Sequence, residues 1–345
     1  MEYSLRPSRI RGNFWRGNPL DTVFLTNLTS PPLLFFLLGA AASLARTDLE
    51  VPESIAKLLS IYLLMAIGFK GGVALSGNEF TGEALKGLFA ALLLASVVPL
   101  YVYWLVRRRV SAADAAALAA TYGSISAVTF VTCTTYLDTV GIEWNGYLVA
   151  AMALMESPAI IVGLLLYRFA VSKGETMPPV SGLLRESLLN GSVFLILGSL
   201  IVGYVSGAEG MAQLNVFVKE LFIGVLCLFL LDMGIVAMRR LADVRQGRQS
   251  FPPLELMAWG LVLPVIGAAF AISLCLILDL PLGDALLITV LAASASYIAV
   301  PAALRLALPA ASPGLYLTAS LGVTFPFNLL IGIPLYHQIL VRLSS

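Results

Sequence analysis

The chain carries the same pattern of small and hydroxyl-bearing residues twice, once in each half. Residues 114–128 read DAAALAATYGSISAV and residues 284–298 read DALLITVLAASASYI, so an aspartate and a Ser-x-Ser pair coincide without a gap. A serine hydroxyl can hydrogen-bond a small anion, and its oxygen can also coordinate a sodium ion. Because both pairs lie inside long apolar segments, they are candidates for a small-ion site.

The residues around each Ser-x-Ser pair favour an interrupted helix. The first pair lies in GSISAVTFVTCTTY, which is rich in Gly, Ser and Thr, and Pro301 follows the second pair. Small residues allow close backbone approach, and proline removes a backbone donor. The N-terminus of a half-helix offers free N–H groups and partial positive charge, which suit a small anion. Membrane helices also pack against each other through Ser, Gly and Ala, so a purely structural interpretation stays open.

Three charged residues lie well inside apolar segments, namely Lys70, Glu156 and Asp232. Charges within a membrane are costly and usually mark an ion or substrate pathway. One interpretation pairs Lys70 with one of the two carboxylates near the helix crossing, as a structural ion pair. In the other, a carboxylate binds a coupling cation or Lys70 offers a fixed positive charge to an anion. Asp114 and Asp138 lie near segment ends, where we expect solvated or capping side chains.

The composition predicts the class of protein that must position these residues. Of the 345 residues, 59% are hydrophobic and 12% are charged, and the mean hydropathy is +0.91. Soluble domains have about 25% charged residues, whereas the apolar runs here approach the roughly 20 residues that cross a bilayer. The prediction is an all-α integral membrane protein. A net charge of +1, with no basic cluster interleaved with aromatics, gives no indication of nucleic-acid binding.

The apolar runs predict ten transmembrane helices in two sets of five. The predicted spans are 31–46, 54–75, 84–106, 111–135, 145–170, 190–206, 216–239, 254–279, 283–308 and 312–341. This divides the chain into an N-terminal tail (1–30), a first repeat (31–170), a linker (171–189) and a second repeat (190–345). Five is an odd number, so the two halves must cross the membrane with opposite topology.

Two further matches support an inverted repeat. GFKGGVAL at 68–75 parallels LDMGIVAM at 231–238, and residues 146–167 parallel residues 314–336, at nearly the same shift as the Ser-x-Ser phrases. Inverted repeats are typical of secondary transporters, whose sites lie at the repeat interface near the membrane midplane. Most Lys and Arg residues of the predicted loops fall on the side of the linker, although the arginines of the tail do not. This distribution predicts a cytoplasmic linker and both termini outside.

Residue patterns of enzymes and of tightly bound cofactors are not found. The sequence has one histidine, no phosphate loop of the G-x-x-x-x-G-K-[ST] kind and no G-x-S-x-G elbow. The three cysteines have no paired spacing, so neither a disulfide framework nor a metal site is expected beyond a transported sodium ion. Without a nucleotide site, active transport must use an ion gradient.

Several of these segments resemble the sodium-dependent bicarbonate transporter superfamily, whose best-known members are cyanobacterial. The resemblance runs from about residue 30 to the end and rests on GFKGGVAL, GSISAVTF, ESPAI, AASASYIAVPAALR and SPGLYLTASLGVTFPFNLLIGIPLY. It implies a core and a gate domain with crossed broken helices, a homotrimer in the bacterial inner membrane, and sodium–bicarbonate symport by an elevator-like movement. Cyanobacterial members also have a cytoplasmic PII-like regulator.

The resemblance also implies where the ions bind. The implied bicarbonate site comprises Gly71, Gly72, Val73, Ser124, Ile125, Ser126, Ser294, Ala295 and Ser296. The candidates for coupling to an ion are Lys70, Thr129, Glu156, Asp232 and Tyr297.

The chain departs from the cyanobacterial pattern at three of the coupling positions. Lys70 replaces a small polar residue, Glu156 replaces an aspartate, and Tyr297 lies where those members have a serine-rich run with an aspartate. These departures keep other functions open. One is ion-coupled transport of another small anion or a carboxylate. Another is cation/proton antiport through the three charged residues inside the spans, and a channel or a sensor that does not transport is a further possibility.

Overall fold

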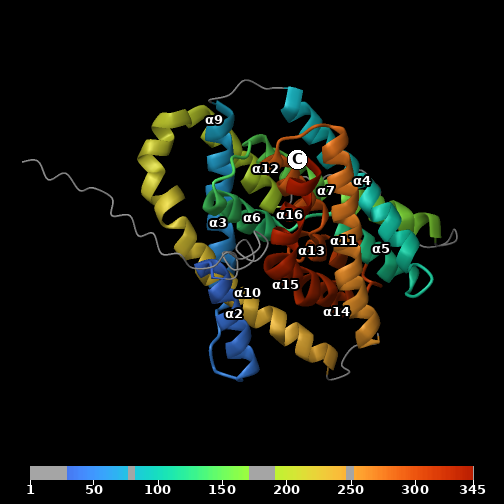
Figure 1. The fold of residues 1–345 in the computed structure, drawn as a ribbon. Coiled ribbons are helices and arrows are strands. Elements are labelled where there is room, and N and C mark those ends of the chain that lie inside the picture. Colours follow the sequence, from blue (N-terminus) through green and yellow to red (C-terminus); the bar gives the residue numbers. More distant parts are fainter. Residues whose placement is uncertain (1–28, 77–81, 171–190, 246–251, 345) are drawn as a thin grey trace, which may run out of the picture.

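The structure is a computed structural model that describes residues 29–76, 82–170, 191–245 and 252–344 (Figure 1). All regular elements in these ranges are helical. Seven helices of the described residues are long and apolar enough to cross a membrane. The predicted all-α membrane fold class is confirmed at this level, whereas ten spans in two inverted repeats stay a prediction. The tail up to residue 28 and the 171–189 linker lie outside the described residues.

Helices occupy all the predicted spans, with different boundaries. In the first half they are α2 (Pro31–Leu44), α3 (Glu53–Ser76), α4 (Gly82–Val106), α5 (Ala112–Gly123), α6 (Ala127–Val140) and α7 (Tyr147–Ala170). In the second half they are α9 (Gly191–Asn215), α10 (Phe222–Arg245), α11 (Pro253–Ile277), α12 (Leu282–Ala292), α13 (Ala299–Ala307), α14 (Pro313–Leu317), α15 (Phe325–Phe327) and α16 (Ile333–Ser344). Many large apolar side chains on these helices face outward, as a lipid-facing surface requires.

The second half is less regular than its apolar runs suggested. Helix α9 continues nine residues beyond the predicted span and bends at Gly207, whose φ of 55° and ψ of −149° are not helical. A π-helical turn, Val216–Glu220, then leads into α10. Two more π-helical segments, Thr318–Thr324 and Asn328–Gly332, interrupt the last span on either side of α15. Pro326 lies between them, and it cannot donate a backbone hydrogen bond.

Both Ser-x-Ser phrases interrupt a helix. The first break separates α5 from α6, and Ser126 caps α6 because its hydroxyl accepts a hydrogen bond from Thr129 N at 3.2 Å. The second break separates α12 from α13, where the Ser296 hydroxyl accepts from Val300 N at 3.2 Å. Pro301 lies in the first turn of α13, where a missing N–H costs no hydrogen bond.

Glycines bring two pairs of helices into close contact. A Cβ added at Gly72 of α3 would meet the backbone oxygen of Leu200 in α9, and one added at Gly203 of α9 would meet that of Phe69. Helices α2 and α10 pack in the same way, through glycines 39 and 234. Figure 1 shows α3 and α9 at one side of the molecule with α2 and the start of α10 below them, whereas α4, α5 and α11 lie at the other side. Close backbone approach of this kind is typical of membrane helices.

The two aspartates of the repeated phrase hold helix N-termini in the opposite half of the chain. Asp114 accepts a hydrogen bond from the backbone N of Ser312, immediately before α14, at 2.7 Å. Asp284 accepts from Asn145 N and Nδ2, both at 2.9 Å, and from the Tyr147 hydroxyl at 2.8 Å. Of the two roles expected for Asp114, solvated or capping, the structure shows the second: its carboxylate bonds Ser111, the N-cap residue of its own helix α5, as well as Ser312, the N-cap residue of α14.

Candidate functional site: the contact between two helix breaks

The two breaks are joined by hydrogen bonds. The backbone N of Ser126 donates to the hydroxyl of Ser294 at 2.9 Å, and the backbone N of Ser296 donates to the carbonyl of Thr121 at 2.9 Å. The Ser294 hydroxyl itself donates to the carbonyl of Leu291 at 2.8 Å. Serine is therefore used here to fix two irregular backbone segments against each other.

Free backbone amides meet at this contact. Among the described residues, no acceptor bonds the amides of Ala127 and Val128 at the start of α6, nor those of Tyr297 and Ile298 ahead of α13. The first turn of a helix leaves such N–H groups unpaired, and together with the helix dipole they form a site for a negative charge. The start of α6 and the two residues just ahead of α13 therefore bring free amides to one contact.

A small pocket lies at that place, and we call it the crossing pocket. Its lining residues are Ser60, Leu63, Leu64, Ile125, Ser126, Ala127, Val128, Val131, Glu156, Phe229, Ser296, Tyr297 and Ile298. It offers about 30 Å³ to the centre of a water-sized sphere. One water needs roughly 10–15 Å³ on this measure, so the pocket suits a solute of a few heavy atoms.

Buried polar atoms without protein partners surround the contact. Within the described part of the chain, the hydroxyls of Thr121, Ser124, Thr129 and Thr289 and the Glu156 Oε2 atom have no hydrogen-bond partner. Buried polar groups are almost always paired, so each exception needs an explanation. Several in one region are typical of a site for a polar ligand.

A wider vestibule adjoins the crossing pocket and carries positive charge. It shares Ser60, Phe229, Tyr297 and Ile298 with the pocket and offers about 450 Å³ on the same measure. Lys57 near the start of α3 and Arg240 near the end of α10 also line it, and no acidic residue does. The vestibule therefore suits the passage of an anion toward the pocket.

The structure brings part of the predicted site together. Five of the predicted residues line the crossing pocket: Ile125, Ser126, Glu156, Ser296 and Tyr297. Four more lie within the two breaks or in the first turn of α6 without lining it: Ser124, Thr129, Ser294 and Ala295. The positions of the two breaks were predicted correctly from the sequence. The role of these residues in binding an ion stays a prediction.

The predicted glycine pair lies elsewhere. Gly71, Gly72 and Val73 belong to an unbroken α3 and do not line the crossing pocket. A Cβ at Gly71 would meet Val149 of α7, and one at Gly72 would meet α9. In this structure the two glycines serve helix packing, while their role in binding stays a prediction.

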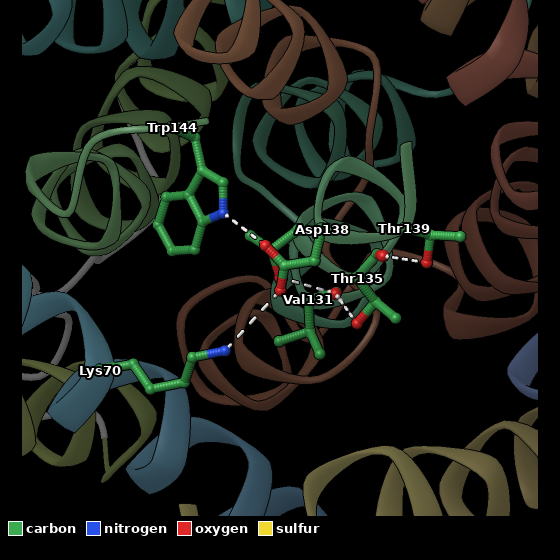
Figure 2. Close-up of polar contacts among 7 residues, drawn as sticks. Lys70, Val131, Thr135, Asp138, Thr139 and Trp144 are labelled. Carbon is green, nitrogen blue, oxygen red and sulfur yellow. Dashed lines mark hydrogen bonds and ion pairs between the residues drawn. The ribbon is translucent and has the colours of Figure 1, made fainter. Parts of the chain in front are cut away.

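The expected position of Lys70 needs correction. Its ammonium group lies 3.9 Å from the carboxylate of Asp138, near the end of α6, rather than beside Glu156 or Asp232 (Figure 2). It also lies 5.2 Å from the ring centre of Phe222. Asp138 is twelve residues after Ser126, which is ~18 Å along a helix. The reason is topological: Lys70 is near the last turn of α3, level with the far end of α6.

The surroundings of this pair are those of a protein surface. Trp144 Nε1 donates to the second Asp138 oxygen at 3.2 Å, and Figure 2 shows both partners on either side of that carboxylate. Thr135 and Thr139 bond to backbone carbonyls of their own helix, at 3.0 and 2.8 Å, and do not contribute. The Asp138 side chain is 54% exposed. Asp232 is buried on α10 but lines neither the crossing pocket nor the vestibule.

The Lys70→Met variant is expected to keep the affinity for bicarbonate, the anion implied by the resemblance. Ion pairs with an exposed partner contribute only ~0–1 kcal/mol to stability, and the ammonium lies far from the crossing pocket. Isothermal titration of the purified variant with bicarbonate measures the affinity, and its thermal unfolding measures stability. A fall in affinity of tenfold or more in a folded variant would instead assign Lys70 to the anion site.

Sequence reasoning missed the residue that secures the second break. Asn328, in the last span, is fully buried and donates from Nδ2 to the carbonyl of Ala293 at 2.7 Å. Tyr336 in turn donates to Asn328 Oδ1 at 3.2 Å. An amide side chain in the middle of an apolar span was the available signal, since polar groups are costly there.

Comparison with known protein families places the chain in one of them. Residues 31–341, nearly the whole chain, match the model of the family described as the Na⁺-dependent bicarbonate transporter superfamily. A comparison with curated proteins gives no significant match.

Proposed function

Because the chain belongs to the Na⁺-dependent bicarbonate transporter superfamily, we propose that it imports bicarbonate together with sodium across the bacterial plasma membrane. Membership in this family makes it a transporter and not an enzyme. The observation that carries the choice of an anion is the pocket between two helix breaks. Residues with free amides, at the start of α6 and just ahead of α13, line it, and such groups at helix N-termini favour a negative charge.

We further propose ten spans in two inverted repeats, 31–170 and 190–345. Reciprocal contacts support this arrangement. The span-four aspartate of each half binds the start of the last span of the other half. Likewise α3 packs on α9 while α10 packs on α2, so that the second span of each half meets the first span of the other.

An elevator-like movement is part of the proposal. The glycine-packed helices α2, α3, α9 and α10 would form the gate, and the remaining helices with both breaks would form the core. The crossing pocket and the vestibule support this division, because each is lined by α3 and α10 on one side and by Tyr297 and Ile298 on the other. Movement of the core along the gate would carry the pocket from one membrane face to the other.

Orientation and assembly follow from the sequence and the resemblance. With the linker in the cytoplasm and both termini outside, Lys57 and Arg240 lie on the cytoplasmic side, so the vestibule is an inward path. The homotrimer and a PII-like regulator at the cytoplasmic face rest on the resemblance alone. A second candidate function is the transport of another small oxyanion, because amides and hydroxyls recognise any small oxygen-bearing anion.

The substrate is tested by thermal unfolding of the purified protein with different anions. A ligand that binds only the folded state raises the unfolding temperature in proportion to its saturation. Bicarbonate is expected to give the largest rise, and sodium is expected to increase it relative to choline. Formate, nitrate and acetate at equal ionic strength serve as comparisons. A larger rise with one of these would transfer the function to that anion, and no rise with any of them would contradict an anion site.

Replacing both vestibule cations by glutamine is expected to raise the KM for bicarbonate and leave kcat little changed. Lys57 and Arg240 lie at the mouth of the path rather than in the crossing pocket. They concentrate anions there, and such steering raises association rates by about tenfold or more. Efflux from proteoliposomes in one orientation, at low and high choline chloride, measures the effect, which salt should reduce.

The neighbouring Arg239 supplies the control for this prediction. Its guanidinium pairs with Glu50 at 3.8 Å and does not line the vestibule. The Arg239→Gln variant should therefore keep the wild-type KM. An equal rise of KM in the control would show that the effect comes from overall charge, not from the vestibule.

A further inference from the structure

We propose that Glu156 is a proton-binding residue of the crossing pocket, and that its carboxyl carries a proton whenever the anion is bound. The inference rests on the proposed function, because it needs an anion in that pocket. According to this inference, a proton binds to the protein together with bicarbonate, in addition to sodium.

The geometry of Glu156 sets it apart from the other buried acids. It lies on α7, is 4% exposed and lines the crossing pocket. No described residue donates a hydrogen bond to its carboxyl group, and its Oε2 atom is buried without a partner. Asp114 and Asp284, by contrast, accept hydrogen bonds from Ser111, Ser312 and Tyr147.

The residue that corresponds to Glu156 in the second repeat is also hydrogen-bonded, unlike Glu156. In the register that aligns Pro158 with Pro326, Glu156 corresponds to Thr324. The Thr324 hydroxyl bonds the carbonyl of Gly260 at 2.6 Å and the hydroxyl of Tyr122 at 2.7 Å. The second half thus fills this position with a neutral, fully bonded side chain, and the first half places an unbonded carboxyl against the pocket.

Charge explains why the anion and a proton should bind together. An anion and a glutamate carboxylate in one small pocket repel each other, and the largely apolar lining screens this repulsion poorly. Protonation removes the repulsion and adds an O–H donor that can bond the anion. The balance is simple: one proton joins the carboxylate as one anion enters the pocket, and both leave together through the vestibule.

Among the described side chains that line the crossing pocket, none carries a fixed positive charge that could replace the proton. Tyr297 is the one other titratable side chain that lines the crossing pocket. Lys57 and Arg240 line the adjoining vestibule instead. On the described parts of the elements packed against α7, several titratable side chains bond to other partners: Tyr62 to Phe217 O, Lys70 to Asp138, Tyr101 to Leu263 O, Tyr122 to Thr324, Asp114 to Ser111 and Ser312, and Asp284 to Asn145 and Tyr147. The others on these elements, Glu53, Glu83, Lys86, Tyr103, Tyr204 and Glu209, do not line the crossing pocket.

A proton fits this position better than a sodium ion does. The lining side chains that carry oxygen are those of Ser60, Ser126, Glu156, Ser296 and Tyr297, and the rest are apolar. The Ser126 and Ser296 hydroxyls already accept backbone hydrogen bonds as helix caps. A proton needs one carboxyl oxygen, whereas a sodium ion needs several oxygen ligands.

The test is the pH dependence of bicarbonate affinity in sodium-free choline buffer, measured by isothermal titration. The concentration of free bicarbonate is corrected for its own protonation at each pH. Wild-type affinity is expected to fall by about tenfold per pH unit on the alkaline side, because one proton must be taken up. Glu156→Gln, a neutral side chain of the same shape, is expected to bind with the same affinity at every pH.

Each alternative result has a distinct meaning. Wild-type affinity that does not change with pH would overturn the inference without any variant and would leave the proposed function intact. Loss of binding in a folded Glu156→Gln protein, or sodium restoring alkaline affinity in the wild type, would make Glu156 a sodium-binding residue and also overturn it. If the wild type bound no bicarbonate at any pH, either with or without sodium, the proposed function would fail and this inference with it.

Discussion

Replacing Ala127 with proline is expected to lower the affinity for bicarbonate by at least about tenfold, because hydrogen bonds to charged groups contribute ~1.5–3 kcal/mol. The substitution removes one of the free amides at the crossing pocket. Ala127 is the first residue of α6, where proline is well tolerated. Ser126 before it has φ −105° and ψ 107°, an extended conformation that a residue preceding proline prefers. The variant should therefore fold and bind weakly.

The matched control lies at the other half of the same broken span. Ala112 is the first residue of α5, and the preceding Ser111 is also extended, with φ −59° and ψ 157°. Ala112→Pro removes an equivalent amide outside the crossing pocket and should leave the affinity unchanged. Isothermal titration of both variants makes the comparison. If Ala127→Pro binds bicarbonate as the wild type does, the amide of residue 127 does not hold the anion.

Replacing Asp284 with alanine is expected to lower the free energy of unfolding by about 3 kcal/mol or more. The carboxylate is fully buried and accepts three hydrogen bonds, two from Asn145 and one from Tyr147. Each buried donor left without an acceptor costs ~1–3 kcal/mol. The two halves of the chain are held together at this point, so denaturant or thermal unfolding in detergent should report the loss directly.

An exposed carboxylate near the same point provides the comparison. Glu143 lies in the loop before α7 and is exposed, and its backbone contacts Gly283. Glu143→Ala should change the free energy of unfolding by less than about 0.5 kcal/mol, as surface substitutions usually do. Equal stability of Asp284→Ala and Glu143→Ala would show that the three hydrogen bonds do not join the halves.

The breaks could be predicted because their causes are local. Small residues, paired serines and Pro301 disfavour a continuous helix wherever they occur together, and the structure interrupts both spans at these positions. Long apolar runs likewise predicted the helices, since a membrane span needs little beyond length and hydropathy. The capping role of Asp114 followed from its place at a span end, but its partner in α14 did not.

The positions of the predicted site residues that lie outside the crossing pocket depend on contacts between distant parts of the chain. A Gly-Gly pair can either interrupt a helix with a turn or allow another helix to pack closely. At Gly71 and Gly72 the helices α7 and α9 pack closely, so α3 stays continuous. The sequence offers Glu156 and Asp232 as ion-pair partners for Lys70. The relative positions of α3 and α6 instead place Asp138 next to it. The role of Asn328 depends on a carbonyl freed by a break in another span, which only the assembled fold defines.

The decisive measurement is the initial uptake of radiolabelled bicarbonate into proteoliposomes, with and without an inward sodium gradient. Wild-type protein is compared with Ala127→Pro and Ala112→Pro at equal amounts of folded protein. We expect the sodium gradient to accelerate uptake by the wild type and by Ala112→Pro, and Ala127→Pro to lose most of the uptake at low bicarbonate. No uptake by folded wild-type protein, or undiminished uptake by Ala127→Pro, would contradict bicarbonate transport through the pocket between the two helix breaks.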